Sequence, residues 1–531
     1  MAAMASQAAS MLQEMLHAQG SPVLLLSLAA LAVLPPLLLL VHLTTAPPAA
    51  SAGDADALLR RLPSPPRLPV IGHMHLVGAL PHVSLAALAA AHGPDLLLLR
   101  LGAVATVVAS SPRAAEAVLR THDHALASRP RSMVADVVIY GAADSCYSPY
   151  GDHFRRVRKL VAVHLLNSHK VQAYRPAREE EVRLVLRRLA AGGVVDVSEA
   201  MNSFANDLIC RAVSGKFFRE EGRNRLFREL IDTNAALLGG FNLEDYFPRL
   251  AGIGVVSELI CARAKKVRRR WDQLLDKLID DHAAKAVRRG GDGGEDEEKD
   301  FIDVLLSRQE EYGLTRDHMK AILVDMFEAG TETSSLTLEC AMAELMRKPH
   351  IMAKLQEEVR RNVPKGQEMV TEDDLANLTY LKAVIKETLR LHPAAPLMIP
   401  HFSMEACEIM DGYTIPAGTR VIVNAWAIGR LSSHWDMAEE FMPERFMDGD
   451  PTSVDIKGKD FRYLPFGSGR RMCPGIHAAA ATLEIMLANL VYRFDWELPA
   501  GMKKEDIDMT EVFGLTVHRK EKLLLVPKIV A

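Results

Sequence analysis

A glycine-rich turn that carries one cysteine constrains this chain more than any other feature. Residues 466–475 read Phe-Gly-Ser-Gly-Arg-Arg-Met-Cys-Pro-Gly and stand directly before a predicted helix. Gly467, Gly469 and Gly475 let the backbone turn tightly, so that amide N–H groups can point at the Cys473 sulfur. The N-terminus of the following helix favours negative charge at the same place. The pattern indicates a thiolate metal ligand, and a buried structural cysteine in a turn is the alternative.

Composition indicates a large folded protein rather than a charged or disordered one. The 531 residues include 63 Lys+Arg and 67 Asp+Glu, for a net charge of −4, and 49% of them are apolar. This balance argues against a polybasic nucleic-acid binder and against a charged disordered chain. The six cysteines form no CxxC pair, which argues against a disulfide framework or a structural zinc site and favours a reducing compartment.

The N-terminal segment has the composition of a membrane anchor. The first 59 residues contain no Lys or Arg, and residues 23–41 form an apolar run long enough to span a bilayer. Basic residues begin at Arg60, Arg61 and Arg67, so the charge bias places the N-terminus on the lumenal side. A cleaved signal peptide and a plastid transit peptide are the alternatives. We expect a lumenal tail at residues 1–21, a transmembrane anchor at 22–43, a linker and proline-rich hinge at 44–69, and a cytosolic domain at 70–531.

The rest of the chain is predicted to be mainly α-helical with small sheets. Residues 96–109 fit a hairpin of buried strands around Gly102. A helix capped by Thr315 extends to about Lys348, so at 1.5 Å per residue it is about 50 Å long and crosses the body. Further helices are expected at 381–391 and 476–494, strands at 419–423 and 522–526, and a solvated loop at 288–300.

The middle of the long helix carries a second motif, Ala-Gly-Thr-Glu-Thr at residues 329–333. A glycine inside a helix lowers helix stability by about 1 kcal/mol relative to alanine, so the presence of Gly330 indicates a packing or functional requirement. Taken alone, the motif is also compatible with a threonine that bonds back to its own helix.

Together the two motifs resemble those of the cytochrome P450 heme-thiolate monooxygenases of plant type, and the resemblance extends from the anchor to the C-terminus. It implies a P450 fold, mainly α with small β-sheets, in which the long central helix crosses over heme b. It also implies that Cys473 is the axial ligand of the heme iron, where a thiolate assists O–O cleavage. Glu332 and Thr333, with Ala329 and Gly330, match the segment that holds O2 and manages proton delivery.

The same resemblance implies the remaining cofactor contacts. Arg158 matches a helix that reaches a heme propionate, but Phe154 stands where a tryptophan is usual, so one N–H donor is absent. The implied cofactor-binding residues besides Cys473 are Arg158, His401, Phe466, Gly467 and Arg471.

Three charged residues match a structural feature of the family. Glu387 and Arg390 are three residues apart on one predicted helix, which is the spacing of a surface ion pair. Arg445, in Pro-Glu-Arg-Phe at residues 443–446, stands where the family has the third member of a buried triad. The resemblance therefore implies that the three residues stabilise the core and help to retain heme.

The positions that match the family's substrate pocket are almost all apolar. Such a lining suits a small neutral substrate and offers no partner for a carboxylate or phosphate. Several of these residues are equally compatible with core packing. The positions are Val137, Val138, Leu237, Phe241, Phe327, Leu397, Met398, Phe513 and Leu515.

At finer grain the chain is similar to the grass enzymes that oxidise indole and its lactam derivatives in benzoxazinoid defence synthesis. Residues 62–75, 221–227, 368–373 and 508–514 carry this similarity. It implies oxidation of indole to indolin-2-one, with hydroxylation of indolin-2-one or a later benzoxazinone as the alternative.

The family resemblance also implies location and partners. We expect a single-pass protein of the endoplasmic reticulum membrane that takes NADPH electrons from NADPH–cytochrome P450 reductase, uses O2 as co-substrate, and binds a small aromatic substrate but no nucleic acid. Two other classes are an isomerase or dehydratase that needs neither O2 nor a reductase, and a heme-binding sensor or scaffold without turnover. Neither of these needs the acid–alcohol pair Glu332 and Thr333.

Overall fold

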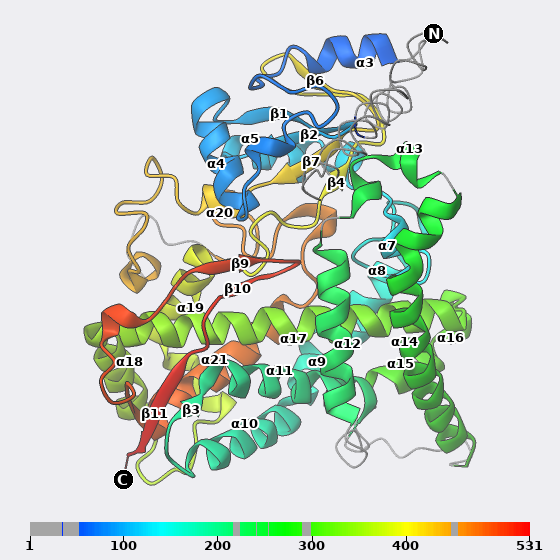
Figure 1. Cartoon of the computed structure of the whole chain (residues 1–531). Helices are drawn as coiled ribbons and strands as arrows, with labels where there is room; N and C mark the ends of the chain where they lie inside the picture. The colour runs from blue at the N-terminus through cyan, green and yellow to red at the C-terminus, as the bar shows by residue number, and fades with distance from the viewer. Residues whose placement is uncertain are drawn as a thin grey trace, which may run out of the picture.

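The long helix α17 (Arg316–Arg347) crosses the whole molecule (Figure 1). The computed structural model describes residues 34, 52–215, 223–240, 242–252, 254–288, 299–447 and 455–530. Thr315 caps α17 as expected: its side chain accepts a hydrogen bond from the His318 N–H, and the His318 ring accepts one from the Thr315 N–H. This reciprocal capping box fixes where the helix begins.

Two helical layers bury α17. Along its second half pack α11 (Val197–Ser214), α19 (Thr379–Leu391) and α21 (Ile476–Arg493), which share the largest apolar core with α10 (Arg175–Leu189) and α18 (Pro349–Asn362). Its first half belongs to a second core formed with α7 (Met133–Val138), α12 (Arg223–Leu238), α14 (Gly254–Arg288) and α15 (Phe301–Ser307). The middle of α17 therefore lies where the two cores meet.

Small sheets lie outside this helical body. The four-stranded sheet has the order β1-β2-β7-β4, and its antiparallel β1–β2 hairpin turns at Gly102, with φ of 61°. A Cβ atom at Gly102 would lie 2.6 Å from the Tyr246 carbonyl oxygen, so only glycine fits there. The strands of this sheet are β1 (Leu96–Leu101), β2 (Val104–Ala109), β7 (Arg420–Val423) and β4 (His401–Phe402).

The other sheets have two or three strands each. They are β3 (Val195–Asp196) with β11 (Leu524–Ile529) and β8 (Phe494–Glu497), β9 (Glu511–Phe513) with β10 (Val517–Arg519), and β5 (Cys407–Met410) with β6 (Tyr413–Ile415). The remaining helices are α3 (Ala52–Leu59), α4 (Pro81–His92), α5 (Pro112–Glu116), α6 (Asp123–Leu126), α8 (Asp152–Leu160), α9 (Ser168–Ala173), α13 (Pro248–Ala251), α16 (Gln309–Tyr312) and α20 (Ala425–Ile428).

The predicted elements are confirmed with shifts at their ends. Helix α19 begins at Thr379 rather than Leu381, and α21 ends at Arg493 because Phe494 starts β8. Strand β11 starts at Leu524 and extends beyond the predicted end to Ile529. Of the predicted loop at 288–300, Arg288 ends α14 and residues 289–298 lie outside the described residues.

Part of the segment predicted as a linker and hinge, residues 44–69, is helical. Residues 52–59 form α3, which packs on β6. Leu59 and Leu62 are buried in a core cluster, and Asp56 forms ion pairs with Arg60 and Arg100. Burial of these two leucines favours a docked helix over a free linker.

The predicted anchor at residues 22–43 lies outside the described residues except for Leu34. Among the helices that the structure describes, none combines the length and apolar character needed to cross a membrane.

Candidate active site

The cysteine turn precedes α21 as the sequence predicts. Gly467 and Gly469 have φ of 67° and 68°, which is the left-handed region that favours glycine. A Cβ atom at Gly469 would lie 2.1 Å from the Leu119 carbonyl oxygen. The turn closes with a 2.9 Å hydrogen bond from the Cys473 N–H to the Phe466 carbonyl oxygen.

The Cys473 sulfur is buried and has a backbone N–H donor and a guanidinium group nearby. Burial raises the pKa of the thiol, while the Gly475 N–H, which bonds to the sulfur, and the nearby Arg158 guanidinium lower it. The backbone donor is therefore in place for a thiolate, as the glycine spacing predicted. A Cβ atom at Gly475 would stand only 3.7 Å from the sulfur.

Cys473 lines a cavity of about 350 Å³ between the cysteine turn, α11 and α17. Met326, Ala329, Gly330 and Thr333 line it from α17. Its walls are predominantly apolar, which suits a flat hydrophobic group. The other predicted site residues on its wall are Arg158, Met398, His401, Phe466, Gly467 and Arg471.

The motif on α17 is placed at this cavity without a break in the helix. The Thr333 hydroxyl donates to the Ala329 carbonyl oxygen at 2.7 Å, which is the back-bonded arrangement that the sequence left open. A Cβ atom at Gly330 would stand 2.8 Å from Ile209 Cδ1, so this glycine allows α11 to approach α17 closely. The Glu332 carboxyl group lies elsewhere, since it accepts a 2.6 Å hydrogen bond from the Thr516 hydroxyl.

Three guanidinium groups, of which that of Arg129 is buried and those of Arg158 and Arg471 are half-buried, lie at the cavity and bond main-chain carbonyl oxygens. Arg129 donates to Cys146, Ile399 and Pro400, while Arg471 donates to Ala127, Ser145 and Ser148. Arg158 donates to the Met472 carbonyl oxygen.

Burial acts strongly on these cations. It lowers the pKa of Arg471 to about 9 and that of Arg129 to about 10, and it lowers the pKa of Arg158. Burial also lowers the pKa of His401 to about 3, so its ring is neutral, and its Nδ1 atom contacts the Leu126 carbonyl oxygen at 3.0 Å. Three desolvated cations facing one cavity fit an anionic group such as the two propionates of heme.

Phe154, at the position where the family usually has tryptophan, packs against Arg471. Its ring is buried and lies 3.7 Å from the Arg471 guanidinium carbon, measured to the ring centroid. This cation–π contact helps to orient the Arg471 guanidinium group.

The predicted triad comes together in the buried core. Arg390 donates to Glu387 at 2.7 and 2.8 Å, and Arg445 donates to Glu387 at 3.2 Å. The remaining donors of Arg390 reach the carbonyl oxygens of Gly429 and Ala438, so the charges are enclosed by partners.

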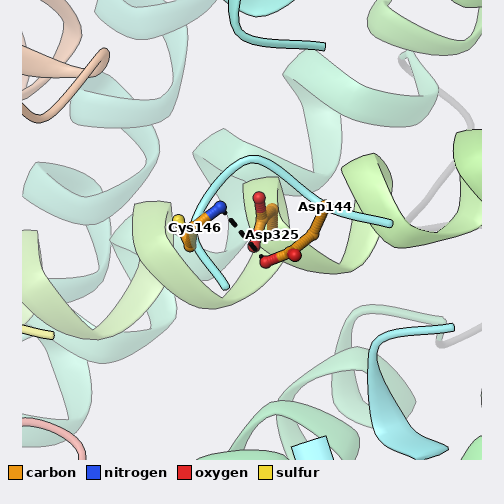
Figure 2. A group of neighbouring side chains, drawn as sticks. All are labelled: Asp144, Cys146 and Asp325. Carbon is orange, nitrogen blue, oxygen red and sulfur yellow. Dashed lines mark hydrogen bonds between the residues drawn. The ribbon is translucent and has the colours of Figure 1, made fainter. Parts of the chain in front are cut away.

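One pair of buried carboxyl groups, formed by Asp325 of α17 and Asp144 of the loop that crosses it, was not predicted. Figure 2 shows Asp144 and Cys146 on a loop that passes over Asp325 of α17. Burial raises the pKa of both carboxyl groups, and the neighbouring Asp325 raises that of Asp144 further. Asp144 Oδ1 meets no donor among the described residues, so a proton on Asp144 can bond Asp325.

Asp325 in turn holds the loop to the helix. It accepts 2.8 Å hydrogen bonds from both the N–H and the hydroxyl of Ser145. The sequence signal was a single acidic residue inside the apolar stretch from Ile322 to Phe327. Arg129 and Thr516 left no comparable signal.

The predicted substrate-pocket residues are dispersed. Met398 lines the cavity, and Phe327 stacks on Phe227 at 4.1 Å in the second core. Phe513 of β9 stacks on the His82 ring at 6.0 Å. Phe241 lies outside the described residues. The others, Val137, Val138, Leu237, Leu397 and Leu515, are buried or half-buried.

A cysteine turn, three guanidinium groups at one cavity and a helical wall with a Gly-Thr-Glu-Thr motif together define the site of a heme-thiolate protein. The family model for cytochrome P450 matches residues 62–526, and this chain belongs to the cytochrome P450 family. It is accordingly a monooxygenase that uses heme iron, O2 and NADPH electrons supplied through a reductase, and acts on a small organic substrate.

The particular relatives are enzymes of maize. An indole-2-monooxygenase of Zea mays is 64% identical, over 99% of this chain and 100% of that protein. An indolin-2-one monooxygenase of Zea mays is 53% identical, over 88% of this chain and 90% of that protein. Among solved structures, a zebrafish cytochrome P450 determined with abiraterone has a TM-score of 0.70 at 26% identity, over 85% of this chain and 100% of that one. The predicted fold is thereby confirmed.

Proposed function

We propose that this protein is a membrane-bound monooxygenase that converts indole to indolin-2-one in benzoxazinoid defence synthesis. The reaction consumes indole, O2, two electrons and two protons and yields indolin-2-one and water. The end-to-end identity of 64% with a maize enzyme named for indole oxidation supports this substrate. The observation that carries the proposal is that Cys473 and Thr333, from two different elements, line the same apolar cavity.

In this proposal the cavity holds the cofactor, which supplies O2 activation when bound. Cys473 would bind the iron, and the cations at the cavity would compensate the propionate charges. Phe466 and Gly467 line the cavity beside Cys473 and would contact the cofactor there. The residues that would hold the propionates are Arg129, Arg158, His401 and Arg471.

The chain's own residues position the substrate and control protons. Ala329, Gly330 and Thr333 line the cavity from α17, and the two small residues keep this wall free of long side chains. Glu332, next to Thr333 in the motif, is the acid that supplies protons through Thr333, and burial raises the pKa of its carboxyl group. The Glu387, Arg390 and Arg445 triad stabilises the core on the Cys473 side and so helps to retain heme.

The proposal places the protein in the endoplasmic reticulum membrane. Residues 1–21 form a lumenal tail, 22–43 the transmembrane anchor, and 44–69 the connection, of which α3 is a docked part. Residues 70–531 form the cytosolic catalytic domain, which receives electrons from NADPH–cytochrome P450 reductase. The apolar run and the absence of basic residues before Arg60 support this orientation.

A second candidate is hydroxylation of indolin-2-one, favoured by the 53% identity with a maize enzyme named for that substrate. Both lactam and indole are small, neutral and aromatic, so the apolar wall admits either.

Turnover of the two substrates in parallel separates these candidates. Membranes that contain the full chain and a plant reductase receive NADPH with either indole or indolin-2-one at equal concentration. We expect NADPH-dependent formation of indolin-2-one from indole, with much slower consumption of added indolin-2-one. Consumption of indolin-2-one without any turnover of indole would contradict the first proposal and support hydroxylation of indolin-2-one.

A further inference from the structure

Two carboxyl groups on one face of α17 meet the β9–β10 hairpin and are held in different ways. Glu332 and Glu339 are seven residues apart, or about two turns, so their side chains leave the helix in the same direction. Figure 1 shows β9 and β10 beside α17. Glu339 forms a 3.0 Å ion pair with Arg519 and accepts a 2.8 Å hydrogen bond from the Ser198 hydroxyl. Glu332, in contrast, meets the Thr516 hydroxyl at 2.6 Å.

The position of Thr516 is set by the backbone around it. The residue is buried, and the N–H of the next residue, Val517, donates to the Ala394 carbonyl oxygen at 2.9 Å. On the other side, a Cβ atom at Gly239 would stand 2.0 Å from the Leu515 nitrogen, so the end of α12 packs directly on the hairpin tip. The Thr516 hydroxyl therefore reaches Glu332 from a fixed place.

This difference in partners matters for proton transfer. Burial raises the pKa of Glu339 as well, but the Arg519 guanidinium opposes that rise and compensates the charge of Glu339. At Glu332 a neutral hydroxyl satisfies one carboxyl oxygen without compensating its charge. Burial raises the pKa of Glu332, the Thr516 hydrogen bond lowers it, and the charge of Asp232 raises it. A carboxyl group on whose pKa opposing influences act can take up and release a proton during turnover.

The groups around Glu332 connect it to the protein surface rather than to the cavity. Asp232 of α12 is exposed, and it interacts electrostatically with Arg228, Glu199 and the exposed His518 of β10. On α17 itself, Glu328 lies one turn away, and burial raises its pKa to about 8. Glu332 contributes no atom to the wall of the described cavity, which Thr333 lines.

We propose that Thr516 is a positioning residue of the reaction, because its hydroxyl holds the Glu332 carboxyl group on the hairpin side of α17, where it is reprotonated from the Asp232 side before it serves Thr333. The inference rests on the proposed role of Glu332 in proton delivery. Without Thr516, Glu332 loses its defined outward position and proton delivery becomes slower. O2 that receives two electrons and two protons without insertion leaves as H2O2, so slower delivery appears as uncoupling.

The test compares Thr516→Val, which keeps the shape and removes the donor, with Thr516→Ser, which retains it. Ser198→Ala is the matched control, because it removes the equivalent hydroxyl from Glu339 two turns away. Full-length protein with reductase and NADPH is assayed with indole for H2O2 and indolin-2-one formed per NADPH. We expect the product-to-peroxide ratio to fall about tenfold in Thr516→Val, the size expected for one hydrogen bond to a charged group, and to recover in Thr516→Ser.

A second readout does not depend on turnover. The carboxylic C=O stretch of Glu332, assigned by its loss in Glu332→Gln, is followed by infrared spectroscopy against pH. Removal of the donor that lowers the pKa of Glu332 should move this titration to higher pH in Thr516→Val and leave it unchanged in Ser198→Ala.

The outcomes distinguish failure of the positioning role of Thr516 from failure of the proposed function. If Glu332→Gln uncouples the reaction but Thr516→Val leaves both coupling and titration unchanged, the positioning role is wrong while the proposed function stands. Equal uncoupling by Ser198→Ala would also overturn it, because general loosening of the hairpin would explain the loss. If Glu332→Gln is fully coupled, Glu332 delivers no proton. The proposed role of Glu332 and the positioning role of Thr516 then both fail, while the oxidation of indole itself stands.

Discussion

At the scale of single residues, the same side-chain type has opposite fates in this fold according to its partners. Glu387 is enclosed by two guanidinium groups, whereas Asp144 faces another carboxyl group, Asp325. The first arrangement compensates a buried negative charge, and the second raises the pKa of Asp144 and favours its protonated form. Each difference is open to measurement by a substitution that removes one charge and keeps the shape.

Asp144→Asn is expected to increase stability at alkaline pH. The raised pKa means that, above the ordinary pKa of aspartate and up to the raised value, the folded chain binds one more proton than the unfolded chain. Stability of the natural protein is thus fully present below the ordinary pKa and falls as pH rises through this window. The loss is about 1.4 kcal/mol per pH unit, and the asparagine, which mimics the protonated group, avoids it.

Chemical unfolding from pH 5 to pH 9 checks this, with Asp144→Ala as the comparison that also removes the acceptor of the Cys146 and Tyr147 N–H groups. Parallel pH profiles for Asp144→Asn and the natural protein would show that Asp144 carries no extra proton.

Glu387→Gln is expected to destabilise the fold by about 3–5 kcal/mol, because it leaves two buried guanidinium groups without a compensating charge. Glu440→Gln is the control: its 2.6 Å ion pair with Lys348 is exposed and should contribute less than about 1 kcal/mol. Thermal unfolding and heme content of both variants provide the measurement. Similar small effects in the two variants would remove the structural role of the triad.

At the scale of elements, the cysteine turn depends on two glycines for different reasons. Both have positive φ, but a Cβ atom at Gly469 collides with the Leu119 carbonyl oxygen at 2.1 Å, whereas the nearest atom at Gly467 is Met398 Sδ at 3.8 Å. Backbone conformation alone constrains Gly467, and packing against the segment before α6 constrains Gly469 as well.

Gly467→Ala should therefore cost about 1–2 kcal/mol of stability and still bind heme, since it adds only left-handed strain. Gly469→Ala must also displace main chain, so we expect loss of the thiolate-type spectrum of the reduced carbon monoxide complex. Difference spectra of the two purified variants decide the point. A normal spectrum in Gly469→Ala would mean that the turn can move away from Leu119.

At the scale of the whole molecule, sequence patterns predict those features that neighbouring residues determine. Thr315 before an apolar-periodic run and the glycines around Cys473 indicate helix and turn, because capping and positive φ depend on neighbouring residues. The family resemblance extended this to the fold and the site. Helix α3 was missed because its stability comes from burial of Leu59 and Leu62, which are distant in sequence from the strands they cover.

The same limit applies to Asp144, Arg129 and Thr516. Each meets partners more than a hundred residues away in the chain, such as Asp325, Ile399 and Glu332, and no local pattern reports that meeting. The substrate-pocket positions were the least predictable, since an apolar side chain packs equally well in a cavity wall and in a core, as Met398 and Phe327 do.

The central claim is that the cavity between Cys473 and Thr333 supports insertion of one oxygen atom from O2 into indole. Turnover of indole under isotopically labelled ¹⁸O2, with reductase and NADPH, tests it most directly by mass spectrometry of the product. The account predicts indolin-2-one that carries one ¹⁸O atom, formed by the natural protein and not by Cys473→Ala. Product oxygen that comes from water, or product formation that persists in Cys473→Ala, would contradict it.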